Sequence, residues 1–147
     1  MTEPVRGIRL GVDVGAVRVG VAASDPDGVL AHPVTTLRRD PNGGRDLDEL
    51  AAIVREMEVV LVVVGLPRSL SGRSGRAAEE ATAYAAALAG RIDPVPVRMV
   101  DERFTTVLAS RTLSKQGVRG RRQRAVVDQA AAVLILQGWL DSKRMTQ

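Results

Sequence analysis

The stretch LGVDVGAVRVGVAASD, residues 10–25, contains two short apolar runs joined by a tight Gly15–Ala16 connection. In the first run apolar residues alternate with a glycine and with Asp13, and in the second run a valine stands at every second position. Alternation of period two is typical of strands that bury one face. The stretch therefore predicts an antiparallel hairpin of two strands, Ile8–Val14 and Val17–Ala23.

Further apolar runs and amphipathic segments follow the hairpin. The residues VVLVVVG lack alternation, as expected of a central strand that is covered on both faces. Together the patterns predict three more strands, over Val34–Leu37, Val59–Val64 and Val95–Val100, and helices over Asp46–Met57, Ser74–Ile92, Thr105–Lys115 and Gln123–Ser142. A hairpin followed by alternating strands and helices indicates an α/β domain with a mixed sheet.

Length and composition favour one domain over residues 1–147, with short flexible tails at 1–6 and 143–147. The chain has no cysteine, which excludes disulfides, zinc-thiolate sites and thiol nucleophiles. Its beginning lacks the apolar core of a signal peptide, and its longest apolar stretch, Ala130–Leu136, is too short to span a bilayer. We expect a cytoplasmic protein with no membrane partner.

Positive charge is concentrated in one part of the chain. The net charge is +4, and residues 103–127 contain seven basic side chains and no acid: Arg103, Arg111, Lys115, Arg119, Arg121, Arg122 and Arg124. A stretch of one sign suits a polyanion, most commonly nucleic acid. A solvated basic surface is the alternative interpretation.

Acidic residues stand in apolar surroundings at three places. These are Asp13 in the hairpin, the pair Asp101–Glu102 at the end of a predicted strand, and Asp128 on the apolar stripe of the last predicted helix. Each has a simpler structural explanation: a hydrogen bond to the glycine turn, a strand-end cap or ion pair, and a favourable position near a helix start. Burying any one of them is unfavourable unless it is paired.

Taken together, the acids at these three places suit a metal site. Acids at the ends of strands and helices can converge at one sheet edge, where like charges in a low dielectric repel unless a cation is present. Carboxylates without histidine or cysteine select hard ions, Mg²⁺ or Mn²⁺. Two such ions can activate water and stabilise the leaving oxygen in phosphodiester cleavage. This chemistry is consistent with a basic stretch that binds nucleic acid.

Four blocks of the sequence closely resemble the YqgF family. In order they are GVDVGAVRVGVA, VVVGLPRSLSGRSG, VDERFTT and VDQAAAVLILQGWL, and they extend over nearly the whole chain. Members of this bacterial family are named variously as pre-16S rRNA nucleases and as Holliday junction resolvases (RuvX). The resemblance implies a ribonuclease H-like fold, with a mixed five-stranded sheet flanked by helices.

The resemblance also implies a divalent-metal nuclease site. Its catalytic and metal-binding acids match Asp13, Glu102 with the neighbouring Asp101, and Asp128. Adjacent strand residues point to opposite faces, so only one of the pair should reach the metals. We favour Glu102 for its longer side chain and keep Asp101 as the alternate.

Basic and glycine-rich segments supply candidates for binding nucleic acid. Arg18 matches the basic position of the family, and GLPRSLSGRSGR (65–76) leads into a helix whose free N–H groups suit phosphate, although it is no Walker A motif. An ordinary capped loop is the alternative there. We expect the loop over Lys115–Arg124 to close on substrate. The full candidate set is Arg18, Arg68, Ser69, Arg73, Arg103, Lys115, Arg119, Arg121, Arg122 and Arg124.

These features lead to one main functional hypothesis and three alternatives. The main one is a Mg²⁺- or Mn²⁺-dependent nuclease acting on structured RNA, in processing of the 5′ end of pre-16S rRNA. The alternatives are cleavage of four-way DNA junctions by a homodimer, a catalytically silent RNA-binding module, and an actin-like ATPase or sugar kinase. That last class uses two such domains, which is more than 147 residues provide. Trp139 is expected in the core, and the lone His32, placed in a loop, has no assigned role.

Overall fold

A computed structural model describes residues 6–67, 75–102 and 121–145 of the chain. The helix expected over Thr105–Lys115 lies outside these residues. None of the described helices is long and apolar enough to cross a membrane.

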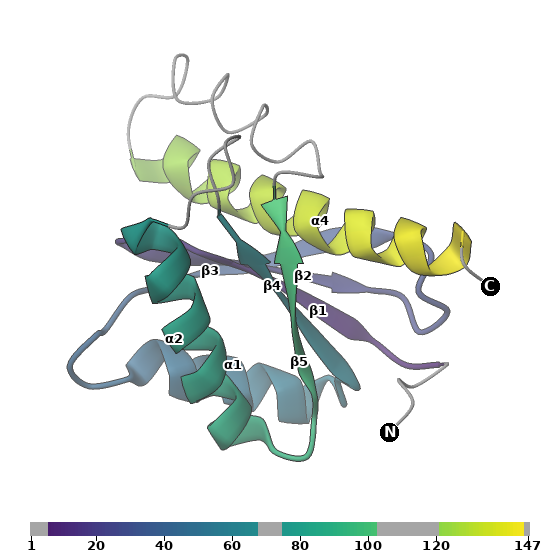
Figure 1. Cartoon of the computed structure of the whole chain (residues 1–147), viewed down its shortest axis with the longest axis horizontal. Helices are drawn as coiled ribbons and strands as arrows, with labels where there is room; N and C mark the ends of the chain where they lie inside the picture. The colour runs from purple at the N-terminus through teal and green to yellow at the C-terminus, as the bar shows by residue number, and fades with distance from the viewer. Residues whose placement is uncertain (1–5, 68–74, 103–120, 146–147) are drawn as a thin grey trace.

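The described strands form one mixed sheet with the order β3-β2-β1-β4-β5 (Figure 1). β2 runs antiparallel to its two neighbours, β1 and β3, whereas β4 and β5 run parallel to β1. This arrangement confirms the predicted hairpin and the ribonuclease H-like α/β class. The strands are β1 (Arg9–Val14), β2 (Arg18–Ser24), β3 (Ala31–Arg38), β4 (Leu61–Leu66) and β5 (Val97–Asp101).

Helices cover both faces of the sheet. α1 (Arg45–Glu56) and α2 (Arg76–Ile92) lie on one face, and α4 (Arg121–Met145) crosses the other (Figure 1). Each face has its own apolar core, and β4 contributes to both because its residues alternate between them. Burial on both faces explains why the sequence of β4 shows no polar alternation.

A glycine in β1 allows α4 to approach the sheet closely. A Cβ at Gly11 would lie 2.6 Å from the Cβ of Leu136 and 2.9 Å from the carbonyl oxygen of Ala132. Any larger residue would therefore push the helix outward. Gly11 therefore determines how near α4 lies to the carboxylates described below.

Several sequence-based boundaries were wrong. β3 begins at Ala31 rather than at Val34, so His32 lies in a strand and is exposed. Pro33 is tolerated there because β3 is an edge strand.

α4 begins at Arg121 and includes Lys143 and Arg144, so the flexible tail predicted over 143–147 is wrong for these two residues. Basic side chains in the last turn of a helix interact favourably with the helix dipole. Trp139 packs, as expected, against the apolar core between α4 and the sheet, which includes Leu61, Val63 and Ile135 and is called the α4-side core below.

Candidate active site

Asp13 is buried on the face of the sheet that α4 covers. Its neighbours Val12 and Leu10 belong to the core under α1 and α2, whereas Gly11 contacts α4. Because side chains alternate along a strand, Asp13 shares the face of Gly11. Only 6% of Asp13 is exposed. A carboxylate is thus held at the carboxyl end of β1, under the first half of α4.

Glu102 follows β5 and lies on the same face. It is 2% exposed, and its carboxyl carbon is 3.4 Å from the point where Gly65 would carry a Cβ. That point faces α4, since Ile135 lies 2.5 Å from it. Gly65 comes one residue after Val64, which pairs with Val12, so the carboxylates of Asp13 and Glu102 flank the end of β4.

Asp101 differs from its neighbour in its environment. It is the last residue of β5, pairs in register with Leu66 and is partly exposed. Val100 packs against the α4-side core, so alternation turns Asp101 toward the opposite face and Glu102 back toward α4. Of the two acids that the sequence left open, Glu102 shares the face of Asp13.

Asp128 reaches the same region from α4. Arg18 in β2 donates from Nε to Asp128 Oδ2 at 3.1 Å, and the two side chains are 23% and 25% exposed. One residue later, Gln129 donates to the Thr36 hydroxyl at 2.9 Å. These two contacts fix the first half of α4 over β2 and β3.

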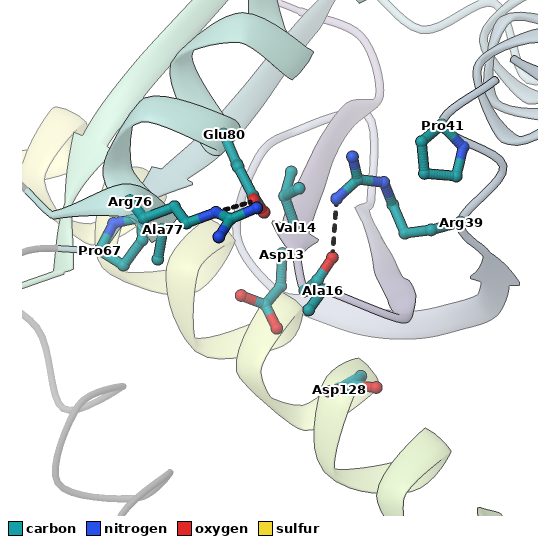
Figure 2. A pocket seen from close by; sticks show the side chains of 11 residues that line it. Asp13, Val14, Ala16, Arg39, Pro41, Pro67, Arg76, Ala77, Glu80 and Asp128 are labelled. Atoms are coloured by element: carbon teal, nitrogen blue, oxygen red, sulfur yellow. Dashed lines mark hydrogen bonds and ion pairs between the residues drawn. The ribbon is translucent and has the colours of Figure 1, made fainter.

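A cleft of about 860 Å³ brings Asp13 and Asp128 together (Figure 2). Its walls also include Arg39, Arg76 and Glu80. Figure 2 shows the carboxylate of Asp128 pointing away from that of Asp13. In the described part of the chain, no three acidic or histidine side chains form a group that could hold a metal ion.

Arg39 is a residue of this cleft that the sequence reasoning missed. Its Nη1 donates to the Gly15 carbonyl at 2.9 Å, and its backbone N–H donates to the Val17 carbonyl at 2.8 Å. Its guanidinium also lies 5.3 Å from the centre of the Tyr84 ring and 3.7 Å from the carboxylate of buried Asp46. Arg39 thus holds the turn that follows Asp13. The pairing of β2 with β3 brings Arg39 beside this turn, and no local sequence pattern indicates the contact.

Arg76 is a second basic residue that the sequence reasoning missed. It is the first residue of α2, it lines the cleft, and its Nε donates to Glu80 Oε1 at 3.2 Å. A cation at the beginning of a helix, 91% exposed, is well placed to meet a phosphate. The glycine- and serine-rich segment before it gave the only sequence signal.

Most of the predicted nucleic-acid-binding residues cannot be placed. Arg121, Arg122 and Arg124 belong to the first turns of α4, at the end of the molecule where α2 begins (Figure 1). Arg18 contacts Asp128 as described above. The others lie outside the described residues: Arg68, Ser69, Arg73, Arg103, Lys115 and Arg119.

The fold and the acidic edge define a ribonuclease H-like domain. A family model for RuvX, described as a Holliday junction resolvase, matches residues 7–142, and the chain belongs to this family. Among solved structures, that of Thermus thermophilus RuvC in complex with a Holliday junction substrate is similar, with a TM-score of 0.58. The match covers 95% of this chain and 97% of that chain, and the 14% sequence identity limits the likeness to the fold.

Curated relatives are much closer in sequence. A protein of Mycobacterium sp. (strain KMS) is 61% identical over 142 residues, which cover 97% of this chain and 84% of the relative. A protein of Mycobacterium tuberculosis (strain ATCC 25177 / H37Ra) is 59% identical over 141 residues, or 96% and 82% of the two chains. Both are named "Putative pre-16S rRNA nuclease".

Proposed function

We propose that this chain is a divalent-metal-dependent nuclease that hydrolyses structured RNA in the cytoplasm, at the 5′ end of pre-16S rRNA. The observation that carries the proposal is the burial of Asp13 and Glu102 on one face of the sheet, at the ends of β1 and β5, next to a cleft that Asp13 shares with Asp128. The names of the relatives at 59–61% identity supply the substrate.

The donor chemistry at this edge fits Mg²⁺ or Mn²⁺. The three side chains supply only carboxylate oxygens, which these ions prefer. Gly65 adds no side chain next to Glu102, so Ile135 and the Glu102 carboxyl group can both approach the end of β4 closely. Asp13, Glu102 and Asp128 would hold the metal, which when bound activates water and stabilises the leaving oxygen of a phosphodiester.

The remaining residues of the cleft would bind and orient the substrate. Arg39 and Arg76 lie in its walls on opposite sides of Asp13 (Figure 2), where their guanidinium groups suit the phosphates that precede and follow the scissile bond. The basic first turns of α4 would extend this grip along the nucleic-acid backbone.

Resolution of four-way DNA junctions is the second candidate. The description of the RuvX family model favours it. The same carboxylates would serve both substrates, and a junction resolvase requires a homodimer that places two cuts symmetrically. The choice therefore depends on substrate preference and oligomeric state.

A cleavage assay with Mg²⁺ or Mn²⁺ tests the proposal. Precursor rRNA, a four-way junction and a linear duplex should be compared for the wild type, Asp13→Asn and Asp128→Asn. Asp141→Asn, which removes the same charge at the far end of α4, is the matched control. We expect metal-dependent cleavage of the precursor that both site variants lose and the control retains. Preferred cutting of the four-way junction would support junction resolution. RNA binding without any cleavage would support a catalytically silent RNA-binding module.

A further inference from the structure

Arg18 holds the one carboxylate of the site that reaches it from a helix. Its Nε lies 3.1 Å from Asp128 Oδ2, and both side chains are about three-quarters buried. Arg18 stands two residues before Gly20, which pairs with Asp13, so Arg18 lies on the α4 face of the sheet. The ion pair thus lies beside the proposed metal site, on its β2 side.

The ion pair accounts for the direction of the Asp128 side chain. The Asp128 carboxylate points away from Asp13 (Figure 2). Two carboxylates at the mouth of one cleft repel each other, and a guanidinium that draws one of them aside relieves the repulsion. Arg18 is well suited to this because its planar fork matches a carboxylate and equally a phosphate.

We propose that Arg18 is an exchangeable counter-ion of Asp128. In the arrangement that the structure shows, it neutralises this carboxylate and holds it away from Asp13. Were Asp128 to serve as a metal ligand, Arg18 would be released and would bind a phosphate of the substrate. Arg18 is therefore a positioning residue, and this inference depends on the metal site proposed above.

A variant of Arg18 that binds Mn²⁺ more tightly but RNA more weakly would distinguish this role from a structural one. We expect Arg18→Gln to bind Mn²⁺ alone about fivefold more tightly in calorimetric titration, because the metal no longer competes with an internal cation. In the same variant, the KM for RNA cleavage at saturating Mn²⁺ should rise several-fold, because a phosphate contact is lost. Arg18→Lys, which keeps the charge, should lie nearer to the wild type in both measurements.

Two further variants serve as controls. Arg38→Gln removes an exposed arginine that faces Arg18 in register on β3, and it should change Mn²⁺ affinity less than twofold. In an Asp128→Asn background, Arg18→Gln should have no further effect on Mn²⁺ affinity. Circular dichroism checks that each variant is folded.

The outcomes separate this inference from the proposed function. If the wild type binds Mn²⁺ through Asp13 but Arg18→Gln binds it equally or less tightly, the exchange is overturned and the metal site stands. If Arg38→Gln tightens Mn²⁺ binding as much as Arg18→Gln, the effect is general electrostatics and the exchange is again overturned. A wild type that binds no Mn²⁺ overturns both proposals.

Discussion

The backbone carbonyl oxygen of Asp128 lies 2.1 Å from the point where Gly20 would carry a Cβ. The helix that carries a site carboxylate therefore rests directly on the hairpin strand paired with Asp13. Because the clash is with backbone, it cannot be relieved by a rotamer change. We predict that Gly20→Ala moves α4 away and destabilises the protein by about 3 kcal/mol, at the upper end of over-packing effects, as measured by urea denaturation.

Gly90 provides the matched control for this substitution. It lies in α2, and a Cβ there would meet nothing within 4 Å. Gly90→Ala should stabilise the protein by about 0.5–1 kcal/mol, because alanine loses less backbone entropy in a helix than glycine does. A Gly20→Ala variant as stable as the wild type would show that α4 packs less closely than the structure indicates.

Gly65 supports a second prediction, which concerns packing next to Glu102. A Cβ at Gly65 would lie 2.5 Å from the Cδ1 of Ile135 but at ordinary contact distance, 3.4 Å, from the Glu102 carboxyl carbon. Gly65→Ala alone should therefore destabilise the protein by about 1–2 kcal/mol. Ile135→Val removes the clashing carbon. The double variant should therefore lose less stability than the sum of the losses in the two single variants. Additive effects in urea denaturation would contradict this packing.

Local pattern was enough to predict the sheet but not its edge. The alternation in the hairpin and the uniform apolarity of β4 depend on which faces are buried, and that information lies within each segment. β3 was predicted too short because Pro33 ordinarily interrupts a strand, and only its place at the sheet edge makes it acceptable.

The acids of the site were visible in the sequence because each interrupts an apolar pattern. Their partners were not: Arg18 meets Asp128, and Arg39 meets the turn at Gly15, across intervals that no local period encodes. The preference for Glu102 over Asp101 rested on side-chain length, whereas the structure supplies the stronger reason that alternation turns Glu102 toward α4.

Arg39 and Asp46 provide a third prediction. Asp46 is 2% exposed and its carboxylate lies 3.7 Å from Arg39 Nε. Arg39→Met leaves this buried carboxylate without that cation, and we expect a loss of about 3 kcal/mol in stability. Asp46→Asn in the same chain should recover most of the loss, because the charge is removed with its partner. A double variant no more stable than Arg39→Met would mean that the Gly15 contact of Arg39, not the ion pair, stabilises this region.

Tyr84, the only tyrosine in the chain, makes a prediction about pH. Burial, and then the nearby charge of Asp46, raise the pKa of Tyr84 far above its usual value of 10.0. The folded protein therefore keeps the phenol proton at a pH where the unfolded chain has lost it, so stability falls as the pH rises above about 10. Tyr84→Phe should lack this part of the fall when urea denaturation at pH 9 and pH 11 is compared. Tyrosinate absorbance that appears near pH 10 in the folded wild type would contradict the prediction.

The arginines in the first turns of α4 should affect how RNA affinity depends on salt concentration. If Arg121, Arg122 and Arg124 contact phosphates, replacing all three by glutamine should reduce the slope of log affinity for RNA against log salt by about two to three units. Glutamine at Arg6, Arg55 and Arg144, three exposed arginines elsewhere on the molecule, removes the same charge and should leave the slope nearly unchanged. Filter binding at several salt concentrations measures both slopes. Equal reductions in the two triple variants would mean that net charge, rather than a basic surface at the beginning of α4, attracts the RNA.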